Sequence, residues 1–497
     1  MAVAVLTHAP ARASSKRFVL GVVAGVLLLR LFYLGGALHP DEGGYLVVAR
    51  AWHAGGPNLY GHYFVDRPPL LIGLYGLAGL VGWDAFIRVI ASLLCVLFVV
   101  AAAWAAHEAV GPRGVRWAAL VAGAFAITPV LQAQEADGEI LAAPFVMLGI
   151  ALTLAAVRRR STWLAVAAGL AAGSAVLVKQ NFGDVVVFAG VLLVASVWQR
   201  RLPLRAAVRV AAGGVAGGAL SLAPTAVYVV WSRVGFTVAW TALFGFRGTA
   251  LDVIEDHSLH APMTRAVGLV GLSLLSGVLP LLVMLLLDAT RSRFSGPPIA
   301  WAVGATLLLD AVSIASGGSY WPHYLIQLGP ALALAAGVWA ADSARVRAAV
   351  VFVIASAVAM TCAVVLSGST SGHSARDVGT WVARSARPGD TATVLYGNAD
   401  VQEATGLPSP YPHMWTLPMR TFDPHLAHLR TLLAGPRAPT WVVAWGDLDP
   451  WHIDAHDRMR LTLAQHYHVV GSLCGHVVYL HDHVNRRLTP RPRTCAP

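Results

Sequence analysis

The sequence predicts a polytopic α-helical membrane protein with a small α/β domain at its C-terminal end. Hydrophobic residues make up 57% of the 497 positions and charged residues only 12%, whereas about a quarter of an average soluble domain is charged. Apolar runs recur about every 20 to 30 residues between Phe18 and Leu366, which suits helices that cross a bilayer. The composition turns polar and mixed near residue 371, where a separate domain begins.

Twelve apolar segments are candidates for membrane helices. The first follows Lys16 and Arg17 without a small-residue cleavage site, so we interpret it as an uncleaved helix rather than a signal peptide. The sequence thus divides into a cytoplasmic N-terminus (1–17), a membrane domain (18–370) and the C-terminal domain (371–497). The segments are centred on residues 18–38, 68–82, 86–106, 117–134, 140–157, 162–178, 181–198, 210–232, 266–288, 297–316, 324–341 and 348–367.

Basic clusters near residues 113, 159, 201, 291 and 345 follow every second segment, and such clusters favour the cytoplasmic side. All five lie inside only if one segment does not cross. The run from Pro68 to Gly82 is the best candidate, because it is short, begins with two prolines and contains four glycines. We expect it to be re-entrant or interfacial. The prediction is eleven spans, with the outer loop 39–85, residues 133–140, residues 233–265 and the C-terminal domain outside.

The formal net charge of +11 does not indicate a nucleic-acid partner, because the basic residues lie between apolar segments. Cys95 and Cys362 fall inside apolar runs, so no disulfide scaffold is expected. Cys474 and Cys495 both lie in the C-terminal domain. They can pair if that domain faces an oxidising compartment, and the sequence leaves this open.

The first outer loop carries charged residues at both ends. Asp41 and Glu42 follow the first helix and open a short helix from Tyr45 to Ala54. They serve either as an acidic helix cap or as chemical groups. Arg67 ends the loop before two prolines, where it either snorkels to head groups or offers a guanidinium fork to a lipid phosphate.

Other polar groups are predicted at the same face. The second outer loop contains Glu135, Asp137 and Glu139, three carboxylates in five residues, which suit plain solubility, a cation or an acceptor hydroxyl. Arg30 lies inside the first helix, and an intramembrane charge is a functional hypothesis by default; the alternatives are snorkelling or pairing with Asp310. Further polar groups at this face are Lys179, Arg247, His323 and Tyr324.

These motifs together resemble the glycosyltransferase C (GT-C) superfamily, specifically its protein O-mannosyltransferase and aminoarabinose transferase branch (family 39 type). The order, spacing and membrane side agree over most of residues 18–345, although no single motif is highly specific. The motifs are Asp41-Glu42, Arg67-Pro68-Pro69-Leu70, the acidic second loop, and His323-Tyr324 with Gln327 and Pro330.

The resemblance implies inverting transfer of a sugar from a polyprenyl-phosphate donor to an acceptor glycan, lipid or protein at the outer face of the membrane. The Ala-, Arg- and Val-rich composition indicates a bacterium, and hence its plasma membrane. Asp41, with Glu42 beside it, is then the base that activates the acceptor hydroxyl. Glu139 matches the second acid, with Asp137 in reserve; the family more often has Asp there. The implied phosphate ligands are Arg67, Lys179, Arg247 and Arg30, and the implied substrate-binding residues are His323, Tyr324 and Tyr45.

Some questions stay open at the level of sequence. The need for a divalent cation varies among relatives, and the sugar, the acceptor and the oligomeric state are undetermined. A transporter or flippase of a polar lipid is the alternative function, with Arg30 and Asp310 along its path, but we find no internal repeat. A degenerate relative that only binds an envelope component is a third hypothesis.

The C-terminal domain is predicted to contain strands at 391–396, 440–444 and 468–480, and helices at 375–386 and 457–465. His452 and His456 have helical i, i+4 spacing, and His466, His468, His481 and His483 follow. Without accompanying cysteine pairs, scattered surface histidines are the preferred interpretation over a metal site.

Overall fold

The computed structural model describes residues 9–53, 56–232, 234–256, 260–291, 296–367, 373–449, 453–491 and 495. The chain forms two compact units, each built from three stretches of sequence. The first unit contains Met1–Leu34, Arg88–Val227 and His260–Ser369, and the second contains Gly35–Ile87, Tyr228–Leu259 and Thr370–Pro497. The second unit therefore combines the predicted outer loop 39–85 with the C-terminal domain.

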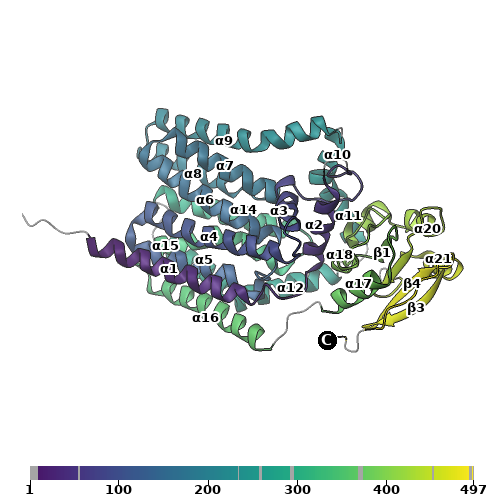
Figure 1. The fold of residues 1–497 in the computed structure, drawn as a ribbon. Helices are drawn as coiled ribbons and strands as arrows, with labels where there is room; N and C mark the ends of the chain where they lie inside the picture. The colour runs from purple at the N-terminus through teal and green to yellow at the C-terminus, as the bar shows by residue number, and fades with distance from the viewer. Residues whose placement is uncertain are drawn as a thin grey trace, which may run out of the picture. The chain divides into compact units, whose positions relative to one another are not determined.

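The first unit is helical, and each predicted apolar segment in it coincides with a helix or a pair of helices (Figure 1). Neighbouring helices such as α6 and α7, α8 and α14, and α5 and α15 pack along their length. The elements are α1 (Ala9–Leu31), α4 (Phe86–Val110), α5 (Pro112–Ile127), η1 (Pro129–Leu131), α6 (Gly138–Arg159), α7 (Thr162–Val178), α8 (Asp184–Trp198), α9 (Leu204–Trp231), α12 (His260–Leu275), α13 (Val278–Arg291), α14 (Pro298–Ser316), η3 (Pro322–Leu328), α15 (Gly329–Trp339) and α16 (Ala344–Ser367).

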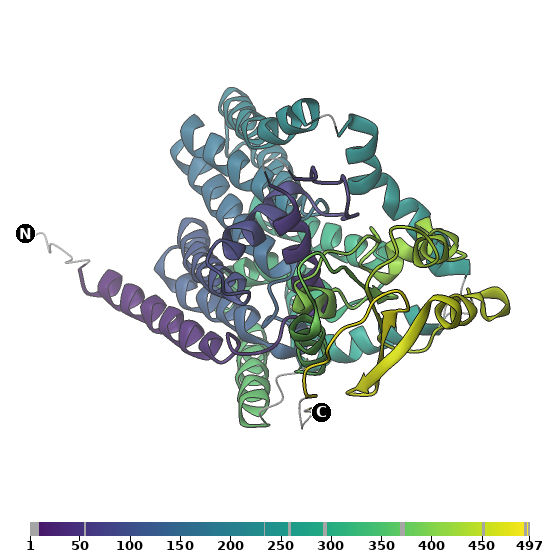
Figure 2. The ribbon, with the colours of Figure 1, turned by 45° about the vertical axis from the view of Figure 1, so that its right-hand side comes forward.

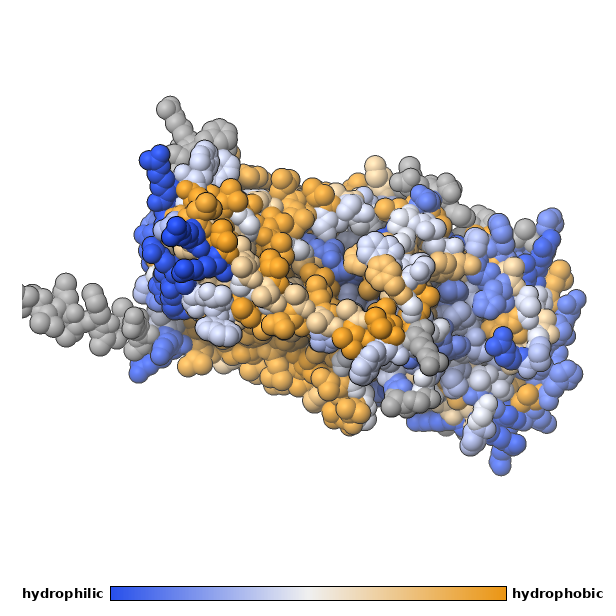
Figure 3. Space-filling view, turned by 90° about the horizontal axis from the view of Figure 1, so that it is seen from above, coloured by the Kyte–Doolittle hydropathy of each residue, from blue (hydrophilic) through white to orange (hydrophobic). Residues whose placement is uncertain are grey.

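The helices of this unit suit a lipid environment. Within the described residues, α4, α6, α9, α14 and α16 are long and apolar enough to cross a membrane, and α12 with α13 adds a sixth candidate. A broad area of hydrophobic side chains is visible on the face of the molecule that Figure 3 shows. The chain is a multi-pass membrane protein, and the total of eleven spans stays a prediction.

The segment 266–288, expected to be one continuous helix, is broken. α12 and α13 meet at an angle of 71°. Gly277 lies at the break with φ of 79°, in the left-handed region that glycine adopts without steric cost. The single glycine was not sufficient to predict the bend, because the apolar pattern continues on both sides of it.

The second unit contains the short helix α3 (Pro69–Gly79), which covers most of the predicted non-crossing segment 68–82. Its 11 residues extend only about 16 Å at about 1.5 Å per residue, half of the hydrocarbon thickness. Leu77 in its last turn, and Leu80 and Trp83 just after it, are exposed. Both properties suit an interfacial or re-entrant helix.

The rest of the second unit is mixed. The predicted helix at Tyr45–Ala54 begins earlier, at Pro40, as α2. The elements are α2 (Pro40–Ala51), α10 (Phe236–Trp240), the π-helix η2 (Thr241–Gly245), α11 (Phe246–Asp256), α17 (His373–Ser385), β1 (Ala392–Leu395), α18 (Ala399–Thr405), α19 (Thr416–Phe422), α20 (Ala427–Leu433), β2 (Trp441–Ala444), η4 (Ala455–Asp457), α21 (Arg458–His466), β3 (Tyr467–Leu473) and β4 (His476–His481).

A four-stranded sheet of order β1-β2-β4-β3 organises the C-terminal domain, so the predicted α/β class is confirmed (Figure 2). β1 pairs parallel to β2, and the other two pairings are antiparallel. Alternate residues of β2 enter different cores: Val442 packs with Leu429 and Met459, whereas Val443 packs with Val378 and Trp381. The sheet is thus covered on both faces.

The predicted strand at 468–480 is a hairpin of two strands, which corrects the sequence-based assignment. The chain reverses at Cys474 and Gly475, which have φ of 54° and 80°. Two consecutive positive φ values are the requirement of a type I′ hairpin turn. A Cys-Gly pair is a weaker signal for such a turn than Asn-Gly, so the alternation of apolar residues appeared continuous.

The C-terminal segment is tied back onto this domain. Cys474 and Cys495 form a disulfide, which settles the pairing that the sequence left open. Arg486 forms an ion pair with Asp390, and Trp381 Nε1 donates to the Thr489 carbonyl at 3.0 Å. Burial raises the pKa of Asp390, but hydrogen bonds from Arg486, the Arg387 amide and Trp441 outweigh it and lower the pKa overall.

The histidines of this domain do not assemble in the part of the chain that is described. His452 lies outside the described residues, and His456 is exposed. No group of three or more His, Cys, Asp or Glu residues within the described ranges has a metal-binding arrangement.

Candidate active site

The two adjacent carboxylates of the first outer loop have different structural roles. His39 is the N-cap residue of α2, Pro40 occupies the first helical turn, and Glu42 Oε2 accepts the His39 backbone N–H at 2.9 Å. This is a capping-box arrangement, in which the side chain satisfies a backbone donor at the helix start. Glu42 is fully buried. The helix-cap interpretation therefore applies to Glu42, whereas Asp41 is held differently.

Asp41 is held by two donors within the second unit. Trp415 Nε1 donates to Oδ1 at 2.8 Å, and the hydroxyl of Tyr45 donates to Oδ2 at 3.3 Å. Tyr45 is one helical turn after Asp41 on α2, which explains why they meet. The carboxylate is only partly buried. The carboxylate of Asp41 is thus fixed in orientation by two hydrogen bonds and is still partly accessible to solvent.

The guanidinium groups of Arg67 and Arg247 lie close to each other, and that of Arg67 is near Tyr45 of α2. Arg67 Nη1 contacts Asp66 Oδ1 at 2.6 Å, and Arg247 Nη2 contacts Asp66 Oδ2 at 2.8 Å. The Arg67 guanidinium also lies 5.8 Å from the centre of the Tyr45 ring. Arg67 and Arg247 thus meet at the same carboxylate. The predicted residues Asp41, Tyr45, Arg67 and Arg247 are therefore brought together through Tyr45 and Asp66.

Aromatic packing places Arg247 beside Asp66. Phe246, at the start of α11, stacks on Phe422 of α19 with ring centres 5.6 Å apart. Phe64 contacts both rings at 4.9 Å and lies two residues before Asp66. Edge-to-face and offset contacts at these distances are favourable. Phe64 and Phe246 therefore fix the segments that carry Asp66 and Arg247.

A second cluster of predicted residues lies in the first unit. Glu139, in the first turn of α6, forms a buried ion pair with Lys179. His323 Nδ1 lies 3.1 Å from Asp137 Oδ2 and 3.0 Å from Gln132 Oε1, and its Nε2 lies 4.0 Å from Glu139. This cluster thus contains two carboxylates, one lysine and one histidine.

The remaining predicted residue of that cluster is Tyr324. The Lys179 ammonium lies 4.8 Å from the centre of the Tyr324 ring, within the range of a cation–π contact. Since Lys179 also pairs with Glu139, its charge is engaged from two sides. Five predicted residues of this unit are therefore neighbours, namely Asp137, Glu139, Lys179, His323 and Tyr324.

Arg30 has a structural set of contacts in the first unit. Its Nη1 donates to the carbonyls of Ala126 and Ala133 at 2.7 Å each, and its Nε donates to Ser92 at 3.0 Å. Carbonyls near the end of a helix lack intrahelical partners, and α5 ends at Ile127. The suggested pairing with Asp310 is wrong, because the guanidinium bonds these carbonyls instead. The contacts favour a structural role for Arg30 over phosphate binding.

Asp310 belongs to a different polar network. Gln327 Nε2 donates to Asp310 Oδ1 at 3.0 Å, and Gln327 Oε1 accepts from Asn181 at 2.9 Å. The Asp310 carboxyl also meets that of Asp184 on α8, and both residues are fully buried. Two ionised carboxylates are acceptors only, so they can bond each other only through a shared proton.

Replacing Asp184 with asparagine is expected to stabilise the first unit. The new amide N–H can donate to Asp310 without the shared proton that two carboxylates need, and a buried hydrogen bond contributes about 1 kcal/mol. Thermal unfolding in detergent, followed by tryptophan fluorescence, should show an equal or higher midpoint for Asp184→Asn. Asp310→Ala should lower the midpoint, because it leaves Gln327 Nε2 without its acceptor. A lower midpoint for Asp184→Asn would contradict the carboxyl-to-carboxyl contact.

Asp400, at the start of α18, carries a buried charge in the second unit. Burial raises its pKa to about 6, and the nearby Glu42 adds to the shift, although the Val401 amide opposes it. A folded-state pKa above the unfolded value means that the folded state binds the proton more tightly. The free energy of unfolding is therefore expected to fall as the pH rises from about 4 to about 6.

The substitution Asp400→Asn should remove this penalty. At pH 7.5 we expect a stabilisation of up to about 3 kcal/mol, since one pKa unit corresponds to about 1.36 kcal/mol. The gain should vanish below about pH 4, where aspartic acid is protonated in both states. The measurement is the unfolding midpoint across this pH range, with the exposed Asp457→Asn as control. A gain that does not depend on pH would exclude the buried charge as its cause.

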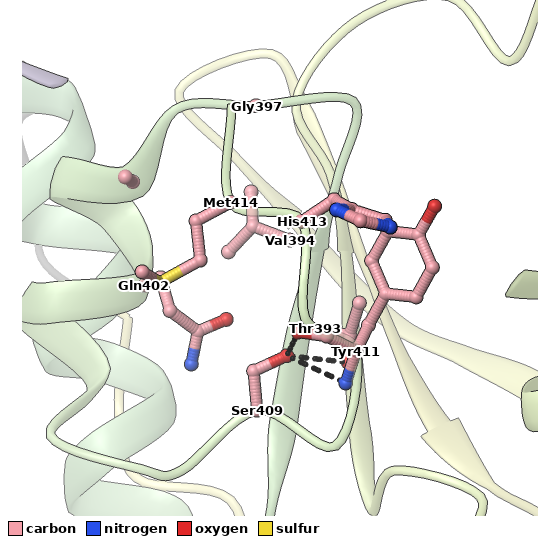
Figure 4. A pocket seen from close by; sticks show the side chains of 9 residues that line it. Thr393, Val394, Gly397, Gln402, Ser409, Tyr411, His413 and Met414 are labelled. Atoms are coloured by element: carbon pink, nitrogen blue, oxygen red, sulfur yellow. Dashed lines mark hydrogen bonds between the residues drawn. The ribbon is translucent and has the colours of Figure 1, made fainter. Parts of the chain in front are cut away.

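A small cavity lies in the C-terminal domain between β1 and the segment 409–414 (Figure 4). The Ser409 hydroxyl bonds Thr393 at 3.2 Å beside it. Burial lowers the pKa of His413 to about 4, so its imidazole is neutral at neutral pH. With about 10 Å³ the cavity holds about one water molecule, which is too small for a sugar. It is lined by Thr393, Val394, Gly397, Ala399, Gln402, Ser409, Tyr411, His413 and Met414.

Sequence analysis missed two residues of the second unit's site. Asp66 is adjacent to Arg67 in the sequence, but its second partner, Arg247, is far along the chain, so the sequence does not show that Asp66 lies between two arginines. Trp415 lies 374 positions after Asp41. No local pattern links residues so distant, and Trp415 carries no motif of its own.

Comparison with known proteins gives matches of fold. No family model and no curated protein matches the chain. The crystal structure of ArnT from Cupriavidus metallidurans bound to undecaprenyl phosphate aligns with a TM-score of 0.59 and 18% identity, over 93% of this chain and 98% of that one. The apo state of the same protein aligns with a TM-score of 0.55.

An archaeal protein shares the same architecture. The oligosaccharyltransferase AglB from Archaeoglobus fulgidus, in complex with an inhibitory peptide and a dolichol phosphate, aligns with a TM-score of 0.50 and 12% identity. The alignment covers 94% of this chain and 74% of AglB. At these identities the matches establish the fold. The chain therefore has the fold of the GT-C membrane glycosyltransferases, as the resemblance in its sequence implied.

Proposed function

We propose that the protein transfers a sugar from a polyprenyl-phosphate-linked donor to an acceptor at the outer face of a bacterial plasma membrane, with inversion at the anomeric carbon. The observation that carries this proposal is the group in the second unit, where an oriented carboxylate, Asp41, shares Tyr45 with the cationic pair Arg67 and Arg247. One group accepts a proton and the other offers positive charge to a phosphate. The proposal needs both.

Similar proteins support the choice of donor. The ArnT structure is bound to undecaprenyl phosphate, and the AglB structure is in complex with a dolichol phosphate. Both ligands are polyprenyl-type lipid phosphates. The structural alignment with ArnT covers nearly the full length of that protein. We infer the same chemical class of donor for this chain.

The proposed reaction is a single displacement. Asp41 takes the proton of the acceptor hydroxyl while the acceptor oxygen forms the new bond to the anomeric carbon. The bond from that carbon to the phosphate oxygen breaks, and the electron pair leaves with the polyprenyl phosphate. Arg67 and Arg247 stabilise the negative charge that develops there. Glu139, with Asp137 in reserve, is proposed as the second acid, and Lys179 and His323 are its partners.

A direct assay tests the proposal. The purified protein in liposomes is given polyprenyl phosphates that carry radiolabelled mannose, arabinose or aminoarabinose, together with an envelope extract as acceptor. We expect release of unmodified polyprenyl phosphate and a labelled acceptor with at least one donor. Movement of intact labelled lipid across the bilayer, without any covalent product, would instead identify a flippase.

A deletion strain identifies the natural substrates. Mass spectrometry of its envelope glycans, lipids and glycoproteins is expected to show one missing sugar, which names the donor and the acceptor class together. An unchanged envelope composition would contradict the proposal. The Asp41→Asn protein should fail to restore the missing sugar.

A further inference from the structure

The C-terminal domain contributes a residue to the site around Asp41. Trp415 Nε1 donates to Asp41 Oδ1 at 2.8 Å, while Tyr45 occupies the other oxygen. Trp415 immediately precedes α19 and belongs to the C-terminal domain, whereas Asp41 belongs to α2. The two residues lie in the same compact unit. A role for this domain was left open by the sequence.

Two adjacent glycines of helix α2, Gly43 and Gly44, allow close contact with the C-terminal domain. A Cβ at Gly44 would lie 2.2 Å from Cζ2 of Trp415, and a Cβ at Gly43 would lie 2.5 Å from Cα of Asp400. Real Cβ atoms do not approach other atoms this closely, so a side chain at position 44 would displace the indole of Trp415, and one at position 43 would press on the backbone of Asp400. Each glycine inside a helix costs about 1 kcal/mol relative to alanine. Two adjacent glycines therefore weaken α2 in isolation and permit close contact with the C-terminal domain.

The indole is fixed by packing and by its neighbours in the chain. Its ring lies 5.5 Å from the ring of Tyr45, the other donor to Asp41. The Trp415 carbonyl accepts the Met419 amide at 3.2 Å, and Thr416 Oγ1 donates to the Tyr396 carbonyl at 2.7 Å, directly after β1. The sheet of the C-terminal domain thus holds the indole in place.

We propose that Trp415 is a positioning residue, through which the C-terminal domain orients the catalytic carboxylate of Asp41. This inference rests on the proposed role of Asp41 as the base. An indole N–H is only a donor, so it fixes the carboxylate without competing for the acceptor's proton. Bonds to both oxygens prevent rotation of the carboxylate. Loss of such orientation affects the chemical step more than ground-state binding.

The first test removes the N–H and keeps an aromatic ring. Trp415→Phe is expected to lower kcat about tenfold, with the KM for the polyprenyl-phosphate donor unchanged. The matched control is Trp445→Phe, because Trp445 stacks on His476 in the same domain and should leave kcat unchanged. An unchanged kcat for Trp415→Phe, with an inactive Asp41→Asn, would overturn the inference while the proposed function stands.

A second variant keeps the side chains of both Trp415 and Asp41. Gly44→Ala should displace the indole and lower kcat to a similar extent. The double variant Gly44→Ala with Trp415→Phe should lose no more than either alone, because both remove the same interaction. Multiplicative losses would contradict a shared cause. If Trp415→Phe unfolds, which thermal unfolding would show, the kcat of the Gly44→Ala protein decides.

A spectroscopic test does not depend on activity. In full-length protein labelled with ¹⁵N-tryptophan, the Trp415 indole resonance is assigned by its absence from the Trp415→Phe spectrum. Asp41→Asn should shift this resonance, because it removes the charge of the acceptor, while the Trp445 resonance stays in place. No shift would show that the contact is absent and would overturn the inference. A shift together with a fully active Asp41→Asn would refute the proposed base but confirm the contact.

Discussion

Asp41→Asn is expected to lower kcat for sugar transfer by about 10² to 10⁴-fold, the range that a general base supplies. Asparagine Oδ1 can still accept from Trp415 Nε1, and its Nδ2 can donate to the Tyr45 hydroxyl oxygen, so the arrangement around α2 should persist. It cannot take a proton from the acceptor hydroxyl. The measurement is single-turnover release of polyprenyl phosphate by purified protein, with folding checked by thermal unfolding.

A matched control separates the base from general charge effects in the second unit. Asp84 is half exposed and pairs with Arg50, so Asp84→Asn removes one carboxylate without touching the site. We expect nearly wild-type turnover for that variant. Undiminished turnover of Asp41→Asn would reject Asp41 as the base and direct attention to the carboxylates Glu139 and Asp137.

The second large effect is expected for Arg67→Ala. Removal of one fixed donor from a developing negative charge typically costs about 10² to 10³-fold in rate, and we expect a loss of this size in kcat/KM. Arg67→Lys should recover only part, because lysine keeps the charge but loses the planar fork that matches phosphate oxygens. The assay compares kcat/KM with direct binding of undecaprenyl phosphate.

The ion pair with Asp66 makes a stability control necessary. Asp66 keeps Arg247 when Arg67 is removed, so the carboxylate is not left unpaired and the fold should survive. The exposed Arg384 on α17 provides a matched Arg→Ala control with unchanged activity. Normal binding and turnover by a folded Arg67→Ala protein would exclude Arg67 from the phosphate site.

The two carboxylates at the start of α2 show how far sequence reasoning reaches. Their adjacency, after a membrane helix and a proline, indicated both a helix cap and a catalytic role. The structure assigns the cap to Glu42, whose side chain meets the His39 amide. Asp41 instead meets Trp415 and Tyr45. Neighbouring positions of a helix point in directions about 100° apart, so adjacency in sequence did not mean a shared environment.

The cationic residues give the opposite lesson. Arg67 and Arg247 were predicted separately, as two outer-face cations, and the structure joins them through Asp66. Arg30 was predicted from its place inside an apolar run. Its bonds to the carbonyls of Ala126 and Ala133 show that a charge in a membrane helix also arises where irregular backbone needs donors. Only the tertiary structure distinguishes the paired outer cations Arg67 and Arg247 from the structural Arg30.

The sequence by itself determined the properties that depend on local composition and period. These are the membrane character, the position of the apolar segments, the α/β class of the C-terminal domain, and the types of side chain available for acid–base and phosphate chemistry. It could not resolve the hairpin at Cys474 and Gly475 or the bend at Gly277, because one residue with positive φ changes the chain direction without changing the apolar pattern.

Tertiary structure alone decided which groups act on one another. The contact between Trp415 and Asp41 joins positions 374 residues apart, and it depends on two glycines of α2 that permit close approach. Hydrophobic patterns report which face of an element is buried, and they carry no information about its partner. For this reason the C-terminal domain appeared in the sequence as an appendage, and its place beside the candidate base emerged only from the folded second unit.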